Sequence, residues 1–244
     1  MLFPGKADIF WHIDPGTPTT ADLARCVEKL GGLLFTQHWG WALTDSGAEC
    51  GWEVCAAWDY YIDKPEPFHR DLCAGRRLAF IGGSDSHRRN PGTCGALTGV
   101  WAAELSRQAV FEALRARRCF ATSGSKMALD FRINGAFAGS EVSAAGPVEL
   151  RIRAWGTRPL EKLRIVRGLV GGEPTAVGVV HEAALTGLHA EVVMRDDPPP
   201  GTSFYYAIVK QSGEDIHYPS NVSIAEGSRA WSSPIWVSSP KANR

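Results

Sequence analysis

The chain has 244 residues, of which 44% are hydrophobic and 21% are charged, as in folded globular proteins and unlike disordered or fibrous ones. Lysine and arginine together number 26, as do aspartate and glutamate, so the formal net charge is zero. This balance argues against nucleic acid or an anionic membrane as the main partner, and no apolar run approaches the roughly 20 residues that span a bilayer.

The first predicted element is a helix that follows Thr19. Thr19 can cap it, its apolar side chains at positions 23, 26, 27 and 30 share one face, and Gly31 ends it. Ser106 can cap a second helix, which carries Val110, Ala113, Leu114 and Arg117 on one side. The arginine-rich end of this second helix suits the helix dipole.

Three short apolar runs between these helices read as buried strands. They cover residues 33–36, 52–54 and 78–81, and a polar, proline-bearing stretch at 63–67 separates the second from the third. Strands that alternate with helices predict a mostly parallel sheet or barrel, here over residues 1–125.

After residue 125 the helix signals stop, and apolar and polar residues alternate. Strands are predicted at 129–133, 148–154 and 163–166, followed by a long central strand at 204–209 and a closing edge strand at 234–237. Residues 126–244 are therefore predicted to form an antiparallel β-sandwich-like domain, which makes the whole chain α/β plus all-β.

The clearest chemical signal is Gly83-Ser84-Asp85-Ser86-His87, which follows the strand at 78–81. Asp85 offers carboxylate oxygen and His87 offers imidazole nitrogen, a pairing that suits zinc, iron or manganese. The carboxyl ends of parallel strands are also where α/β enzymes hold their chemistry. The alternative is a turn in which Asp85 bonds nearby backbone N–H groups and His87 faces solvent.

Two further histidines follow short apolar runs. His38 ends the strand at 33–36 and is either a metal ligand or a histidine packed on a neighbouring tryptophan; beside Asp85 and His87 the ligand interpretation is favoured. His12 follows the run at 9–11 and is either a further ligand or a residue of a terminal loop. The histidines at 69, 181, 189 and 217 lie in polar or turn-like sequence and are assigned no chemistry.

Glu53 lies inside the apolar strand at 52–54. A carboxylate buried there is costly unless it is paired or bound to metal. Glu53 is therefore a candidate ligand, or an acceptor that orients a ligand histidine. The alternative is an outward-facing position on a half-exposed strand.

Together these segments resemble a known superfamily. Gly83-Ser84-Asp85-Ser86-His87 resembles the last metal motif of the PHP (polymerase and histidinol phosphatase) superfamily, in which a strand ending in histidine, like 35–38, and a strand carrying glutamate, like 52–54, come earlier. Four more segments resemble the DUF3604 family, which is related to the CehA/McbA-type metallohydrolases: 97–101, 117–124, 133–135 and 230–237.

The resemblance implies a distorted (β/α)7 barrel with metal at the carboxyl ends of its strands, followed by a β-rich module. It implies His38, Asp85 and His87 as ligands, with His12 as a looser match to a further histidine, and Glu53 as a residue that orients a ligand. The opening H-x-H motif of the superfamily is absent, and barely half of the roughly 250 residues of such a barrel precede the sandwich. We therefore expect the chain to be the C-terminal part of a longer protein, with a partial PHP-type barrel.

The predicted function is metal-dependent hydrolysis of a small ester, phosphoester, amide or carbamate, with zinc, manganese or iron as cofactor and Asp85 as catalytic residue. No nucleophile elbow, phosphate-binding loop or H-E-x-x-H motif is present, which disfavours other hydrolase classes. The alternative is a non-catalytic remnant that acts through binding or oligomerisation. Because a partial barrel leaves a strand edge open, self-association is a further expectation.

The six cysteines lie at positions 26, 50, 55, 73, 94 and 119. Cys50 and Cys55 lack the close spacing of a zinc knuckle, so free thiols packed as small hydrophobic residues in a reducing compartment are predicted. The N-terminal residues lack the basic start and apolar centre of a signal peptide. A cytoplasmic location is therefore expected.

Overall fold

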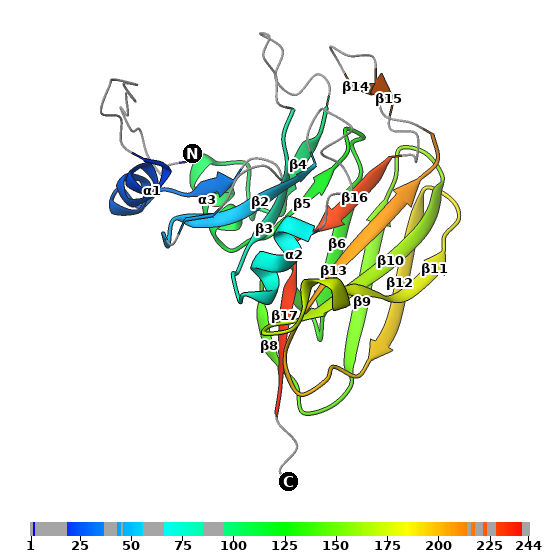
Figure 1. The fold of residues 1–244 in the computed structure, drawn as a ribbon. Coiled ribbons are helices and arrows are strands. Elements are labelled where there is room, and N and C mark those ends of the chain that lie inside the picture. Colours follow the sequence, from blue (N-terminus) through cyan, green and yellow to red (C-terminus); the bar gives the residue numbers. More distant parts are fainter. Residues whose placement is uncertain are drawn as a thin grey trace.

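The computed structural model describes residues 2, 19–36, 43–44, 46–55, 66–84, 95–213, 216–217, 222–223 and 228–240. Within these residues the strands form open sheets, and only a few short helices occur, so the α/β plus β class is confirmed (Figure 1). None of the helices in this part of the chain is both long and apolar enough to cross a membrane.

A three-stranded parallel sheet forms the first part of the fold. Its strands β1 (Leu34–Thr36), β2 (Glu49–Cys55) and β3 (Ala79–Gly82) lie in sequence order. Helix α1 (Thr20–Lys29) precedes β1, and α2 (Glu66–Cys73) connects β2 to β3. The predicted parallel pairing is confirmed for these three strands.

Helix α1 begins where the sequence indicates. Thr19 accepts a hydrogen bond from the Asp22 N–H, and Asp22 accepts one from the Thr19 N–H, which makes a capping box. Its buried residues Ala24 and Val27 pack against Leu34 of β1.

Helix α2 was not predicted, because its residues overlap the stretch at 63–67 that reads as a polar connection. The helix begins at Glu66 and places Pro67 in its first turn, where a missing N–H costs nothing. Phe68 and Leu72, four residues apart, are buried against the strands.

Helix α3 (Arg107–Arg115) has Ser106 as its N-cap, as predicted, with the Ala109 N–H donating to Ser106 Oγ at 3.2 Å. The predicted position of Arg117 on its apolar side is wrong. The helix ends at Arg115, and Arg117 takes a positive φ of 59°.

An eight-stranded sheet forms the centre of the molecule. Its main path runs β11-β10-β13-β16-β5-β4, while β17 pairs with β13 and β8 pairs with β17. Because β4 and β5 precede residue 125 and the others follow it, one sheet contains strands from both predicted regions. The strands are β4 (Leu97–Val100), β5 (Cys119–Thr122), β8 (Glu141–Ser143), β10 (Leu160–Leu169), β11 (Gly178–Ala184), β13 (Gly201–Gln211), β16 (Arg229–Ser232) and β17 (Ile235–Ser239).

Strand β13 is central, as predicted, because β10 covers one of its edges and β16 and β17 share the other. The prediction that β17 closes the sheet as an edge strand is wrong. β17 pairs antiparallel with β13 and parallel with β8. Pro234 precedes the strand, so its missing N–H interrupts no ladder.

A four-stranded antiparallel sheet has the order β12-β9-β6-β7. Its strands are β6 (Ala128–Ile133), β7 (Ala136–Phe137), β9 (Val148–Trp155) and β12 (His189–Asp196). Asn134 and Gly135 both have positive φ and make the predicted turn between β6 and β7. The short strands β14 (Ile216–His217) and β15 (Val222–Ser223) pair with each other, and a 3-10 helix covers Pro174–Ala176.

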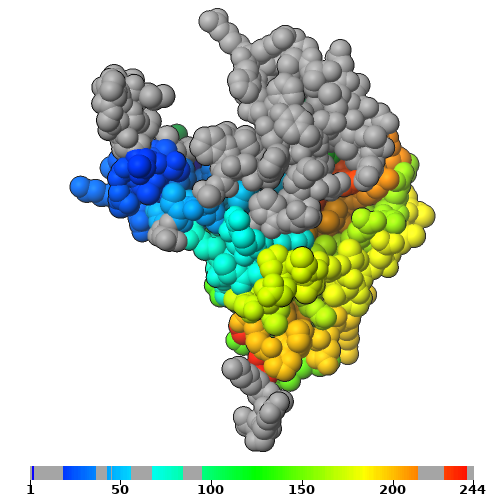
Figure 2. Space-filling model, viewed as in Figure 1, coloured from blue at the N-terminus to red at the C-terminus, as the bar shows by residue number. Residues whose placement is uncertain are grey.

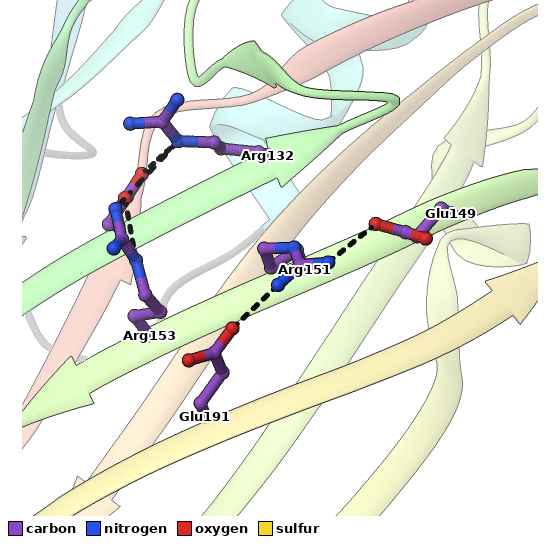
Figure 3. A network of polar contacts seen from close by, with 6 residues as sticks. Arg132, Glu149, Arg151, Arg153 and Glu191 are labelled. Carbon is purple, nitrogen blue, oxygen red and sulfur yellow. Dashed lines mark hydrogen bonds and ion pairs between the residues drawn. The ribbon is translucent and has the colours of Figure 1, made fainter.

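In β6 and β9, charged residues alternate with apolar ones, as predicted, and the charged side chains lie on the outer face of the four-stranded sheet (Figure 3). Arg151 bonds to Glu149 and Glu191, and the buried carboxylate of Asp130 accepts hydrogen bonds from Arg132 and Arg153. The inner face carries the apolar half: Leu129, Phe131, Ile133, Leu150 and Ile152.

The centre of the eight-stranded sheet is buried on both faces, as the side chains of β13 show. Tyr205, Ala207 and Val209 lie in the core shared with the four-stranded sheet, whereas Phe204 and Tyr206 lie in the core shared with α2, β2 and β3. This double burial explains why the middle of β13, residues 204–209, is a continuous apolar run. In Figure 2 the cyan surface of α2 lies between the blue surface of α1 and a yellow-green surface that includes the 3-10 helix Pro174–Ala176.

Candidate functional site

The carboxyl ends of β1, β2 and β3 lie at one edge of the parallel sheet, because the three strands run in the same direction. Two residues after β1 comes His38, and three and five residues after β3 come Asp85 and His87. These three residues and His12 lie outside the described residues. The described strands therefore show that the segments containing His38, Asp85 and His87 follow strands that end at the same edge of the sheet.

Glu53 is the one predicted site residue that the structure describes. It is only 7% exposed, and all seven residues of β2 are buried, so the alternative of a half-exposed strand is wrong. Its carboxylate lies against Gly83: a Cβ built on Gly83 would be 1.9 Å from Glu53 Oε1. Because glycine has no Cβ, the carboxylate fits against the backbone two residues before Asp85.

The backbone at the end of β3 is held from two sides. Thr98 Oγ1 donates to the Gly82 carbonyl at 2.7 Å and accepts from the Gly82 N–H at 3.0 Å. The Gly83 N–H donates to the Cys55 carbonyl of β2 at 3.1 Å. The position of Gly83 next to Glu53 is therefore set by β2 and β4 together.

Within the described part of the chain, no three histidine, cysteine, aspartate or glutamate side chains gather into a possible metal site. The five cysteines that the structure describes, at positions 26, 50, 55, 73 and 119, form no disulfide, as predicted; Cys94 lies outside the described residues.

A second feature, which the sequence reading missed, is a pocket of about 230 Å³ between α2 and the eight-stranded sheet. His69 of α2 and Tyr206 of β13 line it, with their Nε2 and Oη atoms 2.7 Å apart. The rest of its lining is apolar: Val54, Phe68, Val166, Val177, Gly178, Val179, Ile208 and Trp231. Such a lining suits an apolar group with one polar contact.

Burial lowers the pKa of His69 to about 4, so this imidazole is neutral at pH 7. His69 was assigned no chemistry because its sequence context is polar. The signal that could have found it is helical spacing: His69 and Cys73 are four residues apart, beside the buried pair Phe68 and Leu72.

Residues 75–153 match the DUF3604 family, a protein family of unknown function. The matched segment runs from the turn before β3, through Gly83-Ser84-Asp85-Ser86-His87 and α3, to β9. This match supports the resemblance to the DUF3604 family over residues 75–153. The family itself has no assigned activity.

Three uncharacterized proteins of Chlamydia species are similar to the chain. The protein of Chlamydia trachomatis serovar D is 32% identical over 165 residues, which cover 63% of this chain and 24% of that protein. Those of Chlamydia muridarum and Chlamydia pneumoniae are each 31% identical, cover 63% and 58% of this chain, and are themselves covered over 24% and 22%. The chain thus spans about a quarter of the length of the curated relatives that it matches.

A solved structure, a LPMO from Kitasatospora papulosa, aligns with 45% of this chain and 54% of its own at 11% identity and a TM-score of 0.27. A similarity this low carries no argument about the fold or the function.

Proposed function

We propose that the chain contributes to a metal-dependent hydrolase whose site lies at the carboxyl edge of β1, β2 and β3. The observation that supports this proposal is the buried carboxylate of Glu53 against Gly83, at the start of Gly83-Ser84-Asp85-Ser86-His87. A buried carboxylate beside an Asp-x-His segment is what a metal site needs to orient its ligands.

The available donors fit a divalent metal such as zinc, manganese or iron. His38 and His87 would supply imidazole nitrogen and Asp85 carboxylate oxygen, with His12 as a further candidate. The bound metal would lower the pKa of a water molecule and polarise the scissile group. Glu53 would accept the N–H of a ligand imidazole, which fixes the tautomer and the direction of that ring. Asp85 would orient the attacking water.

In this proposal the parallel sheet is part of a PHP-type barrel, and the substrate is a small ester, phosphoester, amide or carbamate. The parallel order β1-β2-β3 and the helix between β2 and β3 agree with such a barrel.

The test is metal content and hydrolysis. The purified chain is loaded in turn with zinc, manganese or iron, dialysed, analysed for metal, and assayed with p-nitrophenyl acetate, p-nitrophenyl phosphate and a phenyl carbamate. We expect stoichiometric metal and turnover of at least one substrate. Asp85→Ala should lose both, whereas Asp197→Ala, at an exposed aspartate, should keep both. A wild-type chain that retains no metal, or Asp85→Ala with unchanged metal and turnover, would overturn the proposal.

A further inference from the structure

Four arginines gather at the amino edge of the parallel sheet, opposite the proposed metal site. Arg76, Arg77, Arg115 and Arg117 line a pocket of about 450 Å³. The pocket reaches Glu49, the first residue of β2, and Leu33, just before β1. A volume of this size is within the range of small-molecule sites.

Carboxylates neutralise only two of these four cations. Glu49 pairs with Arg76 at 2.8 Å and also accepts the Thr44 N–H, so both of its oxygens are used. Glu141 pairs with Arg77 at 3.2 Å. Among the described residues, no ion pair joins Arg115 or Arg117 to a carboxylate, so the ion pairs of this part of the chain leave a local excess of two positive charges among the four arginines.

Among the described residues, Arg115 and Arg117 donate their hydrogen bonds to backbone carbonyls. Arg115 Nη2 donates to the Gly31 carbonyl at 3.5 Å, and Arg117 Nε donates to the Gly139 carbonyl at 3.1 Å. A guanidinium has five N–H donors, so each side chain has further donors to offer a ligand.

Arg117 is held in place by the structure around it. Its positive φ of 59° is uncommon for a residue with a side chain. Gly139 packs directly against it, since a Cβ on Gly139 would lie 2.6 Å from Arg117 Cβ. The guanidinium groups of Arg77 and Arg117 both lie over the ring of Trp236, at 5.0 and 5.6 Å from its centroid.

The positively charged side chains of Arg77 and Arg117 thus lie close together in a partly buried pocket. Burial lowers the pKa of Arg117; the nearby Glu141 carboxylate acts in the opposite direction, and the neighbouring Arg77 lowers the pKa further. Burial raises the pKa of the Cys50 thiol in the same pocket to about 12, so Cys50 adds no negative charge at pH 7. An anion in the pocket would offset this repulsion.

We propose that this pocket binds a small phosphate monoester, with the phosphate between Arg115 and Arg117. A phosphate group carries close to two negative charges at neutral pH, which matches the local excess. Its oxygens also suit the paired N–H groups of guanidinium. The remaining volume leaves room for a small organic group. This inference does not depend on the proposed hydrolase site, which lies at the opposite edge of the sheet.

The test is calorimetric titration of EDTA-treated full chain with inorganic phosphate and with glycerol 3-phosphate, at ionic strength held constant with chloride. We expect saturable binding of both. Arg115→Gln, on the exposed end of α3, should weaken it about tenfold or more, because one charge-assisted pair is lost. Arg117→Gln should do the same, whereas Arg164→Gln, an exposed arginine paired with Glu182, should bind as wild type does.

Arg115→Gln decides the result if Arg117→Gln does not fold. Asp85→Ala should bind phosphate as wild type does, which separates this pocket from the carboxyl edge. The proposal is overturned if phosphate does not saturate, if Arg115→Gln binds as tightly as wild type, or if acetate and citrate bind more tightly than both phosphates.

Discussion

Glu53 and Gly83 make a contact that only a glycine allows. A Cβ at position 83 would overlap the end of the Glu53 side chain, which is flexible, whereas a Cβ on Gly82 would lie 2.6 Å from the Leu97 carbonyl, which is backbone. A methyl group at position 83 can therefore be accommodated if the Glu53 side chain moves, whereas one at position 82 would require the backbone to move.

We predict that Gly83→Ala displaces the Glu53 carboxylate and lowers metal affinity about 10- to 100-fold, the usual effect of losing a residue that orients a metal ligand. Gly82→Ala should instead lower the free energy of unfolding by about 1–3 kcal/mol, because the backbone cannot yield. Metal titration and urea unfolding of both variants measure these effects. Gly146→Ala, whose new Cβ meets nothing within 4 Å, is the control. Unchanged metal affinity in Gly83→Ala would contradict the role of Glu53.

His69 is a buried titratable residue of α2 whose pKa is lowered by burial from 6.5 to about 4. Between these values the unfolded chain binds more protons at this site than the folded chain does. The free energy of unfolding therefore does not depend on this group above about pH 6.5. It decreases as the pH falls from 6.5 toward 4, by about 3 kcal/mol in all.

We predict that His69→Phe flattens the pH dependence of the free energy of unfolding between pH 6.5 and 4. Urea unfolding at several pH values gives the slope for each protein. Tyr206→Phe should keep the wild-type slope, because burial rather than the hydroxyl lowers the pKa. Equal slopes for wild type and His69→Phe would show that His69 is not the group responsible.

Single residues also mark where sequence reasoning stops. The burial of Glu53 was open from the sequence, because three apolar residues suit either a buried or a half-exposed strand. The burial of all seven residues of β2 decides it. Trp52, Val54 and Cys55 of this strand share a core with Trp231 and Trp236, which lie far away in the chain. Helix boundaries were readable at Thr19 and Ser106, since capping depends on residues only three positions away.

At the scale of elements, one serine joins the parallel sheet to the central sheet. Ser233, which follows β16, accepts the Phe80 N–H of β3 at 3.0 Å and donates to the Cys119 carbonyl of β5 at 2.7 Å. It is fully buried, so no water can take its place. The two sheets meet at this hydroxyl.

We predict that Ser233→Ala lowers the free energy of unfolding by about 1–3 kcal/mol, the cost of leaving the buried Phe80 N–H without its acceptor. Urea unfolding measures the change. Hydrogen exchange should also become faster at Phe80. Ser143→Ala, an exposed serine of β8, should change stability by less than about 0.5 kcal/mol. A Ser233→Ala protein as stable as wild type would contradict the importance of this link.

Sequence patterns are least informative where the place of a strand depends on distant pairing. β17 reads as an edge strand because Pro234 precedes it, yet β8, a strand of three residues, pairs with its other side. β11 and β12 lie mostly exposed, so their apolar signal is weak. By contrast, β9 and β13 have strong periodic or continuous apolar patterns and were predicted.

At the scale of the whole molecule, the central sheet connects everything else. Its one face packs on the four-stranded sheet, with Leu150 in that core, and its other face packs on α2 and the parallel sheet, with Leu72 in that core. Because the central sheet contributes side chains to both cores, a substitution that destabilises one core also destabilises the sheet on which the other core packs. The sequence alone divides the chain near residue 125, because the change from helices to strands falls there.

We predict that the chain unfolds in one cooperative transition. Far-ultraviolet circular dichroism, which follows the backbone, and tryptophan fluorescence should give the same urea midpoint. Leu72→Ala and Leu150→Ala, both at fully buried leucines, should each lower the free energy of unfolding by about 2–5 kcal/mol and shift the whole transition for both probes. If Leu72→Ala instead separates an early transition from an unchanged late one, residues 1–125 and 126–244 unfold as independent domains and the shared sheet does not couple them. The two leucines thus test the same sheet from its two faces, and each variant is the control for the other.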